Sequence, residues 1–353
     1  MTARVDFVIA CHSPERPIGR AVASVLDGNA DDVNLIVVCH NVAVDVIKNV
    51  IDERYRSGIT FLHLEDGIRS ASGPFEHGMT SGNAEFVSIM GSDDTLEPGA
   101  VAHWLELADS TGAEVVITRL KLEGNPVHTP PTRPTYSGIA DPVRDRLSYR
   151  SAPLGLVSVD ARKRLDAQLV SGMQVGGDVP YVTNLWFNTR VAVQRSGPAY
   201  VIGESATDRV TYVSRSIGEE FRFIEHLLDS DWFVKLRHAE RVAVCVKLLR
   251  IHVFGVILNR AVDWWTDSER KNLAMVTERI LEAAPGVADR LSIADNRLLT
   301  AIRSRSISHR DMLRCAHLRR RHGMPSTLIP ANPVMLLARE APLRFMVASF
   351  LTR

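Results

Sequence analysis

The first 118 residues alternate short apolar runs with amphipathic helical patterns, and this alternation restricts the chain to few folds. The apolar runs have the length and composition of buried strands, and apolar residues recur at helical spacing between them. Strands separated by helices imply parallel pairing, so the sequence predicts a Rossmann-like, three-layer α/β/α domain with a mostly parallel sheet. The predicted strands span residues 5–10, 33–38, 60–64, 86–90 and 114–118, and the predicted helices span 44–54 and 98–108 and begin at Ile18.

The pattern changes near residue 216. From Glu219 onward, apolar residues recur almost only at helical spacing. The sequence therefore predicts two domains, an α/β domain over residues 1–216 and a helical C-terminal domain over 217–353, which would serve assembly or acceptor placement. Residues 122–142 are rich in proline and threonine without periodicity and are predicted to form a loop that could cover a ligand crevice.

The composition is that of an ordinary globular protein. Hydrophobic residues make up 45% and charged residues 24%, and 42 basic against 41 acidic side chains leave a net charge of +1. This balance gives no reason to expect nucleic-acid binding. The four cysteines form no CxxC pair, which argues against a zinc site and a disulfide framework. The N-terminus enters a strand without a basic and apolar leader, so a cytoplasmic location is expected.

Two C-terminal features bear on membrane contact. The longest apolar run, residues 242–258, is interrupted by basic residues and is shorter than the ~20 residues of a spanning helix. It is predicted to be a buried helix. A basic cluster follows, and it could hold the protein peripherally on the inner face of a membrane or bind a phosphate-rich acceptor. The alternative is a solvated charged face beside a core helix or a homo-oligomer contact. The cluster comprises Arg314, His317, Arg319, Arg320, Arg321 and His322.

The segment from Phe86 to Pro98 runs from an apolar strand into two adjacent carboxylates and then into a proline-opened helix. Carboxylates at the carboxyl end of a strand in an open α/β sheet face the crevice where ligands bind. Hard oxygen ligands suit Mg²⁺ or Mn²⁺ bridging a diphosphate. Asp93 and Asp94 are therefore candidate metal ligands. The alternative is a polar turn in which Asp94 or Thr95 only caps the next helix.

Three segments together resemble the family 2 glycosyltransferases of the GT-A fold, which are inverting enzymes that use nucleotide-sugar donors. The resemblance covers most of residues 5–215. The first segment is similar to the family's opening strand, turn and helix, the second to its acidic motif, and the third to its Gly-Glu-Asp box. These segments are Phe7 to Leu26, Ser92-Asp93-Asp94 with Leu96 and Pro98, and Gly176-Gly177-Asp178.

This resemblance implies a role for each matching residue. Cys11 and His12 would contact the nucleotide base, and Ser92 and Asp93 would bind the nucleotide, with Asp93 on the ribose hydroxyls. Asp94 would hold Mn²⁺ or Mg²⁺, which offsets charge on the departing diphosphate. Asp178 would be the general base that deprotonates the acceptor hydroxyl. The implied donor is a nucleotide-diphosphate sugar, most often a UDP-sugar, and the implied acceptor is a cell-envelope glycan or a lipid-linked saccharide.

The sequence also departs from the family pattern. Asn41 stands where an acidic residue usually reads the base, and the Ala-Arg-Asn motif before the metal strand is missing, so Arg69 is expected to supply the cation. Arg209 lies where related enzymes close over the diphosphate. The Gln-x-x-Arg-Trp signature of processive members is absent, which favours transfer of a single hexosyl unit.

Several alternatives stay open. Glu219 and Glu220 are a second candidate for the general base, although acidic residues are also favoured at a helix start. Asp229-Ser230-Asp231 resembles a metal motif but sits at a helix end. The departures would also suit a non-catalytic nucleotide-sugar-binding or scaffold protein. A nucleotidyltransferase is less compatible, because residues 11–20 contain one glycine and no lysine for a phosphate loop.

Overall fold

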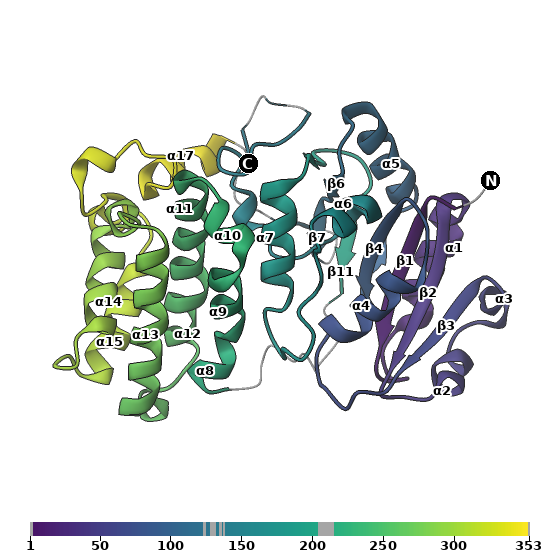
Figure 1. Cartoon of the computed structure of the whole chain (residues 1–353), viewed down its shortest axis with the longest axis horizontal. Helices are drawn as coiled ribbons and strands as arrows, with labels where there is room; N and C mark the ends of the chain where they lie inside the picture. Colours follow the sequence, from purple (N-terminus) through teal and green to yellow (C-terminus); the bar gives the residue numbers. More distant parts are fainter. Residues whose placement is uncertain are drawn as a thin grey trace. The chain divides into compact units, whose positions relative to one another are not determined.

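The computed structural model describes residues 3–122, 125–127, 132–133, 136, 138–203 and 215–351. The chain divides into two compact units (Figure 1). One comprises residues 1–128, 137–140 and 150–212, and the other comprises 129–136, 141–149 and 213–353. No pattern in the sequence predicted that segments ahead of residue 150 join the second unit. The predicted boundary near residue 216 remains a prediction.

In the described residues, seven strands of the first unit form one sheet in the order β10-β6-β9-β4-β1-β2-β3. The pairs β1–β2, β2–β3 and β1–β4 are parallel, as predicted, but β9 is antiparallel to β4 and β6. Antiparallel pairing is possible there because the chain enters β9 without a crossover helix directly ahead of it. The strands are β1 (Val5–Cys11), β2 (Val33–His40), β3 (Ile59–Leu64), β4 (Phe86–Gly91), β6 (Val115–Ile117), β9 (Gly155–Ser158) and β10 (Val191–Val193).

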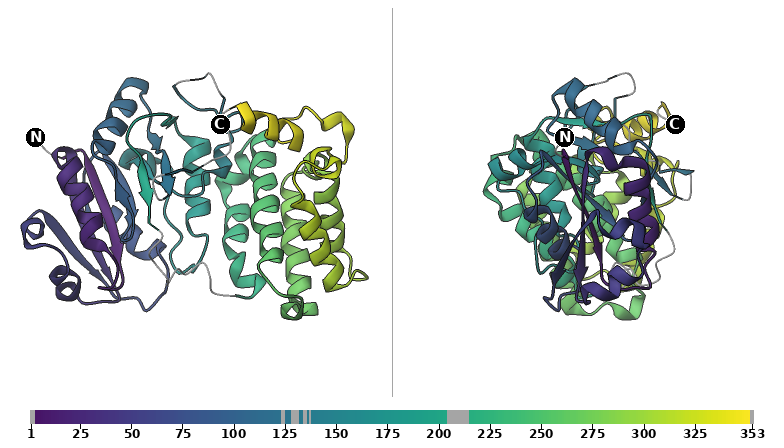
Figure 2. Two further views of the ribbon diagram at one scale, coloured as in Figure 1. Left: turned by 180° about the vertical axis from the view of Figure 1, so that it is seen from behind. Right: turned by 90° about the vertical axis from the view of Figure 1, so that its right-hand side faces the viewer.

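Helices cover both faces of this sheet, which confirms the three-layer prediction (Figures 1 and 2). Phe7 and Ile9 of β1 face the core shared with α1 and α5, whereas α4 packs on β1 and β2. The sequence did not predict α4. The predicted helix over residues 44–54 is two short helices, because Asp52 caps the second by accepting from Arg54 N at 3.1 Å. The helices are α1 (Ile18–Asn29), α2 (Val44–Asn49), α3 (Glu53–Arg56), α4 (Ser72–Ser81), α5 (Ala100–Thr111), α6 (Val159–Arg164) and α7 (Asp178–Asn188).

The strand order creates a topological switch point between β1 and β4. The chain continues from β1 outward to β2 and β3, and then returns to place β4 on the other side of β1. The loops after β1 and β4 therefore leave the sheet in different directions, and such a point is where open α/β sheets bind ligands. In the described residues, a smaller sheet follows the order β5-β11-β7-β8, with strands β5 (Thr95–Leu96), β7 (Leu120–Leu122), β8 (Asn125–Pro126) and β11 (Tyr200–Ile202).

The second unit is helical where the structure describes it (Figure 1). Residues 242–258 are largely buried, as predicted, within α11, a π-helical turn η4 and α12. The described residues include no helix that is both long enough and apolar enough to cross a membrane. The helices are η2 (Leu147–Tyr149), α8 (Ile217–Glu220), α9 (Arg222–Asp229), α10 (Asp231–Lys235), α11 (His238–Lys247), η4 (Leu248–Val253), α12 (Phe254–Leu258), α13 (Asp267–Ala283), α14 (Ile293–Arg303), α15 (His309–Arg319), α16 (Pro325–Leu328) and α17 (Pro342–Leu351).

Candidate functional site

Asp93 and Asp94 occupy the turn between β4 and β5, directly at the carboxyl end of β4. The hydroxyl of Tyr200 donates to Asp94 Oδ2 at 2.5 Å, and the backbone N–H of Gly203 donates to Asp94 Oδ1 at 2.8 Å. Ser92, ahead of the pair, is buried. The carboxylate of Asp94 is thus held by the strand β11 and the residue that follows it.

Tyr200 reaches Asp94 because β11 pairs antiparallel with β5, which places Tyr200 opposite Leu96. Its hydroxyl also accepts from Gly91 N at 3.2 Å, so the phenol joins the end of β4 to the acidic turn. Burial, together with the negative charge of Asp94, raises the pKa of Tyr200 well above its ordinary value. The hydroxyl therefore remains a proton donor to Asp94 at physiological pH.

Asp93 is held from the other side of the switch point. Arg16, in the turn after β1, lies 3.2 Å from Asp93 Oδ2 through Nη1, and Arg20 Nη2 donates to the carbonyl oxygen of Asp93 at 3.0 Å. Both side chains of the Arg16–Asp93 pair are largely shielded from solvent, with 14% and 13% exposed. A cation thus stands next to the acidic pair, and this role of Arg16 was not predicted from the sequence.

The predicted base-contacting residues lie at the carboxyl end of β1. Cys11 is buried, and it pairs in register with Cys39 of β2. Its thiol donates to the carbonyl of Ser13 at 3.2 Å, whereas His12 is exposed in the turn. Burial, with a smaller contribution from Cys11, raises the pKa of Cys39 to about 12. Cys39 is therefore a core thiol.

Asn41 follows β2 in a left-handed conformation, with φ of 53°. Its Oδ1 accepts from the backbone N–H groups of Asp66 and Gly67 at 3.0 and 2.9 Å. The preceding residue, His40, is buried and contacts Asp66 Oδ1 through Nε2 at 2.8 Å. Burial alone would raise the pKa of Asp66, but hydrogen bonds from Ile68 N and His40 outweigh it and lower that pKa. The ionised carboxylate of Asp66 thus lies two residues beyond the end of β3 at Leu64, and it was not predicted from the sequence.

Asp178 is the first residue of α7 and is half-buried. A Cβ at the preceding Gly177 would lie 2.5 Å from Ser72 Oγ, so the chain needs glycine for this close approach. Ser70 Oγ also donates to the carbonyl of Met173 at 2.5 Å. The loop ahead of Asp178 therefore packs on the segment that follows Arg69, whose side chain is exposed. Asp178 also stands where a helix dipole favours an acidic side chain.

The remaining candidate residues are Arg209, Glu219 and Glu220. Arg209 lies outside the described residues. Glu219 belongs to the N-terminal cap of α8, since Ser216 Oγ donates to Glu219 Oε2 at 3.0 Å. Glu220 lies 3.5 Å from Arg260 Nη2 in an ion pair. Glu219 and Glu220, the alternative candidates for the general base, thus each have a partner within the helical unit.

The acidic turn suits a divalent cation shared with a bound diphosphate. Across the described residues, no group of three or more His, Cys, Asp or Glu side chains is arranged to hold a metal ion. Mg²⁺ and its analogues often use one or two carboxylates and take their other ligands from substrate phosphates and water. Asp93 and Asp94 supply such a partial set, and Asp94 is fixed in orientation by two hydrogen bonds.

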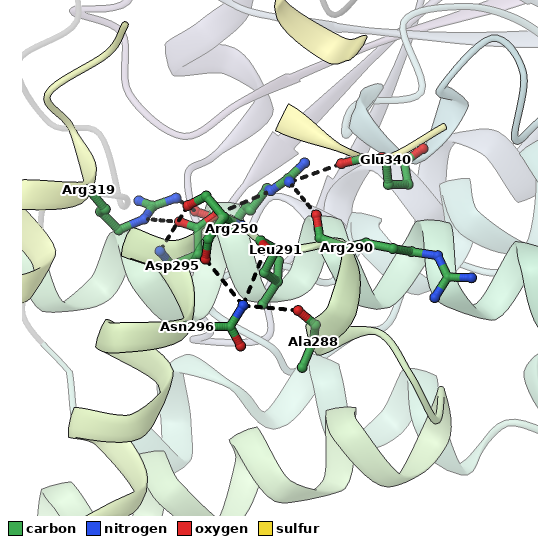
Figure 3. A network of polar contacts seen from close by, with 9 residues as sticks. Arg250, Ala288, Arg290, Leu291, Asp295, Asn296, Arg319 and Glu340 are labelled. Carbon is green, nitrogen blue, oxygen red and sulfur yellow. Dashed lines mark hydrogen bonds and ion pairs between the residues drawn. The ribbon is translucent and has the colours of Figure 1, made fainter. Parts of the chain in front are cut away.

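The basic cluster of the helical unit needs one correction. Arg319 is not an exposed member of it, because its Nε donates to Asp295 Oδ1 at 2.8 Å, and the two side chains are only 15% and 8% exposed. Arg250 Nε lies 3.7 Å from the other oxygen of Asp295, and Arg250 Nη2 donates to the carbonyl of Glu340 at 3.0 Å. Figure 3 shows this network. Arg320 remains exposed, as predicted.

Comparison with known proteins places the fold. No protein-family model matches the chain. The succinoglycan biosynthesis protein ExoO of Rhizobium meliloti (strain 1021) is 29% identical over 119 residues, and this match covers 33% of the chain and 33% of ExoO. The chain thus matches about one third of the length of that curated relative.

Solved structures match over much more of the chain. The structure of S. aureus TarS 1-349 in complex with UDP-GlcNAc superposes with a TM-score of 0.72 at 15% identity, covering 90% of this chain and 91% of that one. TarS 1-349 in complex with UDP gives a TM-score of 0.70 at 15% identity, covering 91% and 92%. The chain has the predicted GT-A architecture with a helical C-terminal region, and at this identity the likeness establishes the fold.

Proposed function

We propose that this chain is a metal-dependent inverting glycosyltransferase that moves one sugar from a nucleotide-diphosphate sugar to a hydroxyl acceptor. The observation that carries the proposal is the acidic turn at the switch point, where Asp94 is fixed by Tyr200 and Gly203 and where Asp93 meets Arg16. Strand-end carboxylates beside a cation are the chemistry that a departing diphosphate requires.

The reaction is a direct displacement at the anomeric carbon. Asp178 takes the proton from the acceptor hydroxyl as its oxygen forms the new bond to that carbon, and the bond from the same carbon to the diphosphate oxygen breaks with its electron pair. A divalent cation held by Asp94 would supply Lewis-acid stabilisation of the departing nucleoside diphosphate. Arg16 and Arg69 are the candidate side chains for its remaining negative charge.

A UDP-sugar is the proposed donor, supported by the structural likeness to TarS, which has been crystallised with UDP-GlcNAc and with UDP. A glycan or lipid-linked saccharide is the proposed acceptor, in keeping with the partial match to a succinoglycan biosynthesis protein. Asp66 is a further candidate for the base subsite, because its ionised carboxylate can accept from a base N–H group.

Calorimetry of UDP binding tests the metal assignment. UDP should bind the wild-type chain more tightly with Mn²⁺ than with EDTA, and Asp94→Ala should remove this difference because the cation loses its protein ligand. Asp109→Ala is the control in the same unit, since Asp109 pairs with Arg4 at 2.9 Å and its side chain has no hydrogen bond to the acidic turn within the described residues. Equal metal dependence in wild type and Asp94→Ala would overturn the assignment of the metal to Asp94.

Transfer kinetics test the general base. Asp178→Asn should keep donor affinity while transfer falls by about 10²-fold or more, because only proton transfer in the transition state is lost. Glu220→Gln is the control and should retain activity. A collapse confined to the Glu220 variant would move the role to that residue.

A second candidate function is non-catalytic nucleotide-sugar binding. The observation that favours it is Asn41, whose Oδ1 is engaged by two backbone N–H groups where the family carries an acidic residue. A single measurement distinguishes the enzyme from the binding protein. A catalyst releases UDP from its donor in the presence of Mn²⁺, whereas a binding protein retains the intact UDP-sugar.

A further inference from the structure

We propose that Tyr200 is a positioning residue for Asp94, and that its hydroxyl fixes the orientation in which this carboxylate meets the metal. The inference deepens the proposed function and rests on it, because it takes Asp94 as the metal ligand. Tyr200 comes from β11, which is in a different sheet from β4, and it lies 106 residues further along the chain than Asp94.

The geometry leaves the Tyr200 hydroxyl one arrangement. Gly91 N–H donates to the phenolic oxygen at 3.2 Å, so the hydroxyl hydrogen is directed to Asp94 Oδ2, 2.5 Å away. A tyrosine hydroxyl has a single hydrogen to donate, and a carboxylate can only accept. The direction of this hydrogen bond is therefore determined by its partners.

The second oxygen of Asp94 is fixed independently. Gly203 N–H donates to Oδ1 at 2.8 Å. With one donor on each oxygen, the carboxylate cannot rotate without breaking a hydrogen bond. A carboxylate oxygen can accept a hydrogen bond and still bind a cation, so these two hydrogen bonds do not by themselves exclude a metal. Partners of this kind, which hold a ligand rather than the metal itself, control affinity as well as orientation.

The surroundings of Tyr200 keep water from taking over its role. The side chain is 1% exposed, and its ring belongs to the core cluster of the first unit. Removal of the hydroxyl deletes the hydrogen bond from Tyr200 to Asp94 Oδ2, while the ring continues to fill the same space. Tyr200→Phe is therefore a substitution that separates positioning of the carboxylate from packing.

The experiment compares UDP binding with and without Mn²⁺ in Tyr200→Phe by calorimetry, with the native fold checked by circular dichroism and thermal melting. The gain in UDP affinity on adding Mn²⁺ should fall by about 10–100-fold, the usual effect of losing a partner that orients a metal ligand. UDP affinity in EDTA should not change. The control is Tyr55→Phe, because Tyr55 also donates its hydroxyl to a carboxylate, that of Asp27, in the same unit.

The outcomes distinguish the two levels of the proposal. Loss of the Mn²⁺ effect in Asp94→Ala with a wild-type response in Tyr200→Phe would overturn the positioning role alone. An unchanged Mn²⁺ effect in Asp94→Ala would overturn the metal assignment, and the role of Tyr200 with it. If Tyr200→Phe weakened binding equally in Mn²⁺ and EDTA, the hydroxyl would support the local structure of the turn and not the metal ligand, and the inference would be wrong. If Tyr200→Phe did not fold, direct titration of Mn²⁺ against UDP-bound Tyr200→His, whose ring N–H is a donor, would decide between these outcomes.

Discussion

Replacing Arg319 by methionine should destabilise the helical unit far more than the same change at Arg320. Arg319 donates to Asp295 at 2.8 Å, and its guanidinium lies 4.8 Å from the centre of the Phe254 ring. Breaking a buried ion pair by removing one partner costs about 3–5 kcal/mol. Because Arg250 still lies 3.7 Å from Asp295, we expect the lower end of this range, about 3 kcal/mol.

Thermal unfolding measures this effect. In a unit of this size, each kcal/mol lowers Tm by roughly 2–4 °C, so the Arg319 variant should melt roughly 6–12 °C below wild type. Arg320→Met is the matched control, because a surface substitution changes stability by about 0.5 kcal/mol or less. Melting temperatures that agree within about 1 °C for the two variants would refute the reasoning.

The dependence on pH gives a second check. Burial raises the pKa of Asp295, but Arg250 and Arg319 outweigh it, so the folded-state pKa is lowered. A lowered folded-state pKa means that the pair contributes its stability above the unfolded pKa of about 3.9 and loses it as pH falls through the folded value. The difference between Arg319→Met and wild type should therefore stay constant from about pH 8 to 5 and shrink below about pH 4.

Three further predictions concern other parts of the chain. Neutralising Arg320 and Arg321 should raise the acceptor KM and weaken its salt dependence, with donor hydrolysis unchanged, if the cluster attracts an anionic acceptor; an altered donor KM alone would contradict this. Gly203→Ala should abolish Mn²⁺-dependent UDP binding, because its Cβ would lie 1.9 Å from the backbone carbonyl oxygen of Asp93. Normal binding would show that β11 can shift to make room for the methyl group. Cys39 should resist alkylation by iodoacetamide in the native protein at pH 9, because this pH lies below its raised pKa of about 12. Detection of alkylated Cys39 by mass spectrometry would contradict this.

The sheet could be predicted because its central strands are buried on both faces. Such strands form nearly continuous apolar runs, as Val5–Cys11 and Phe86–Gly91 do apart from Asp6 and Ser88. The helix α4 could not be predicted in the same way, since Ser72–Ser81 contains glycine, proline and serine and few apolar residues. Its position depends on packing against β1 and β2, which a local pattern does not contain.

The residues of the candidate site also differ in whether a local sequence pattern predicts them. Asp93, Asp94 and Asp178 stand at the ends of recognisable local patterns, and they remain predictions for their chemical roles. The local sequence around Tyr200 does not distinguish it from other strand residues. Its contact with Asp94 depends on the pairing of β11 with β5, which a local pattern does not contain. The inward position of Arg319 did have a signal, because Met312, Ala316 and Arg319 follow at helical spacing and the first two are fully buried.

The assignment of residues 141–149 to the helical unit has a consequence for folding during synthesis and for recombination between genes. Arg146 donates to the carbonyl of Arg339 at 3.2 Å, Tyr149 packs against Phe345, and η2 lies against α11. During synthesis this segment emerges long before the helices that it contacts, so it must wait for the rest of the chain. A fragment ending at residue 216 would carry it without partners and should aggregate. A single genetic crossover at residue 216 would therefore separate residues 141–149 from the helices that they contact.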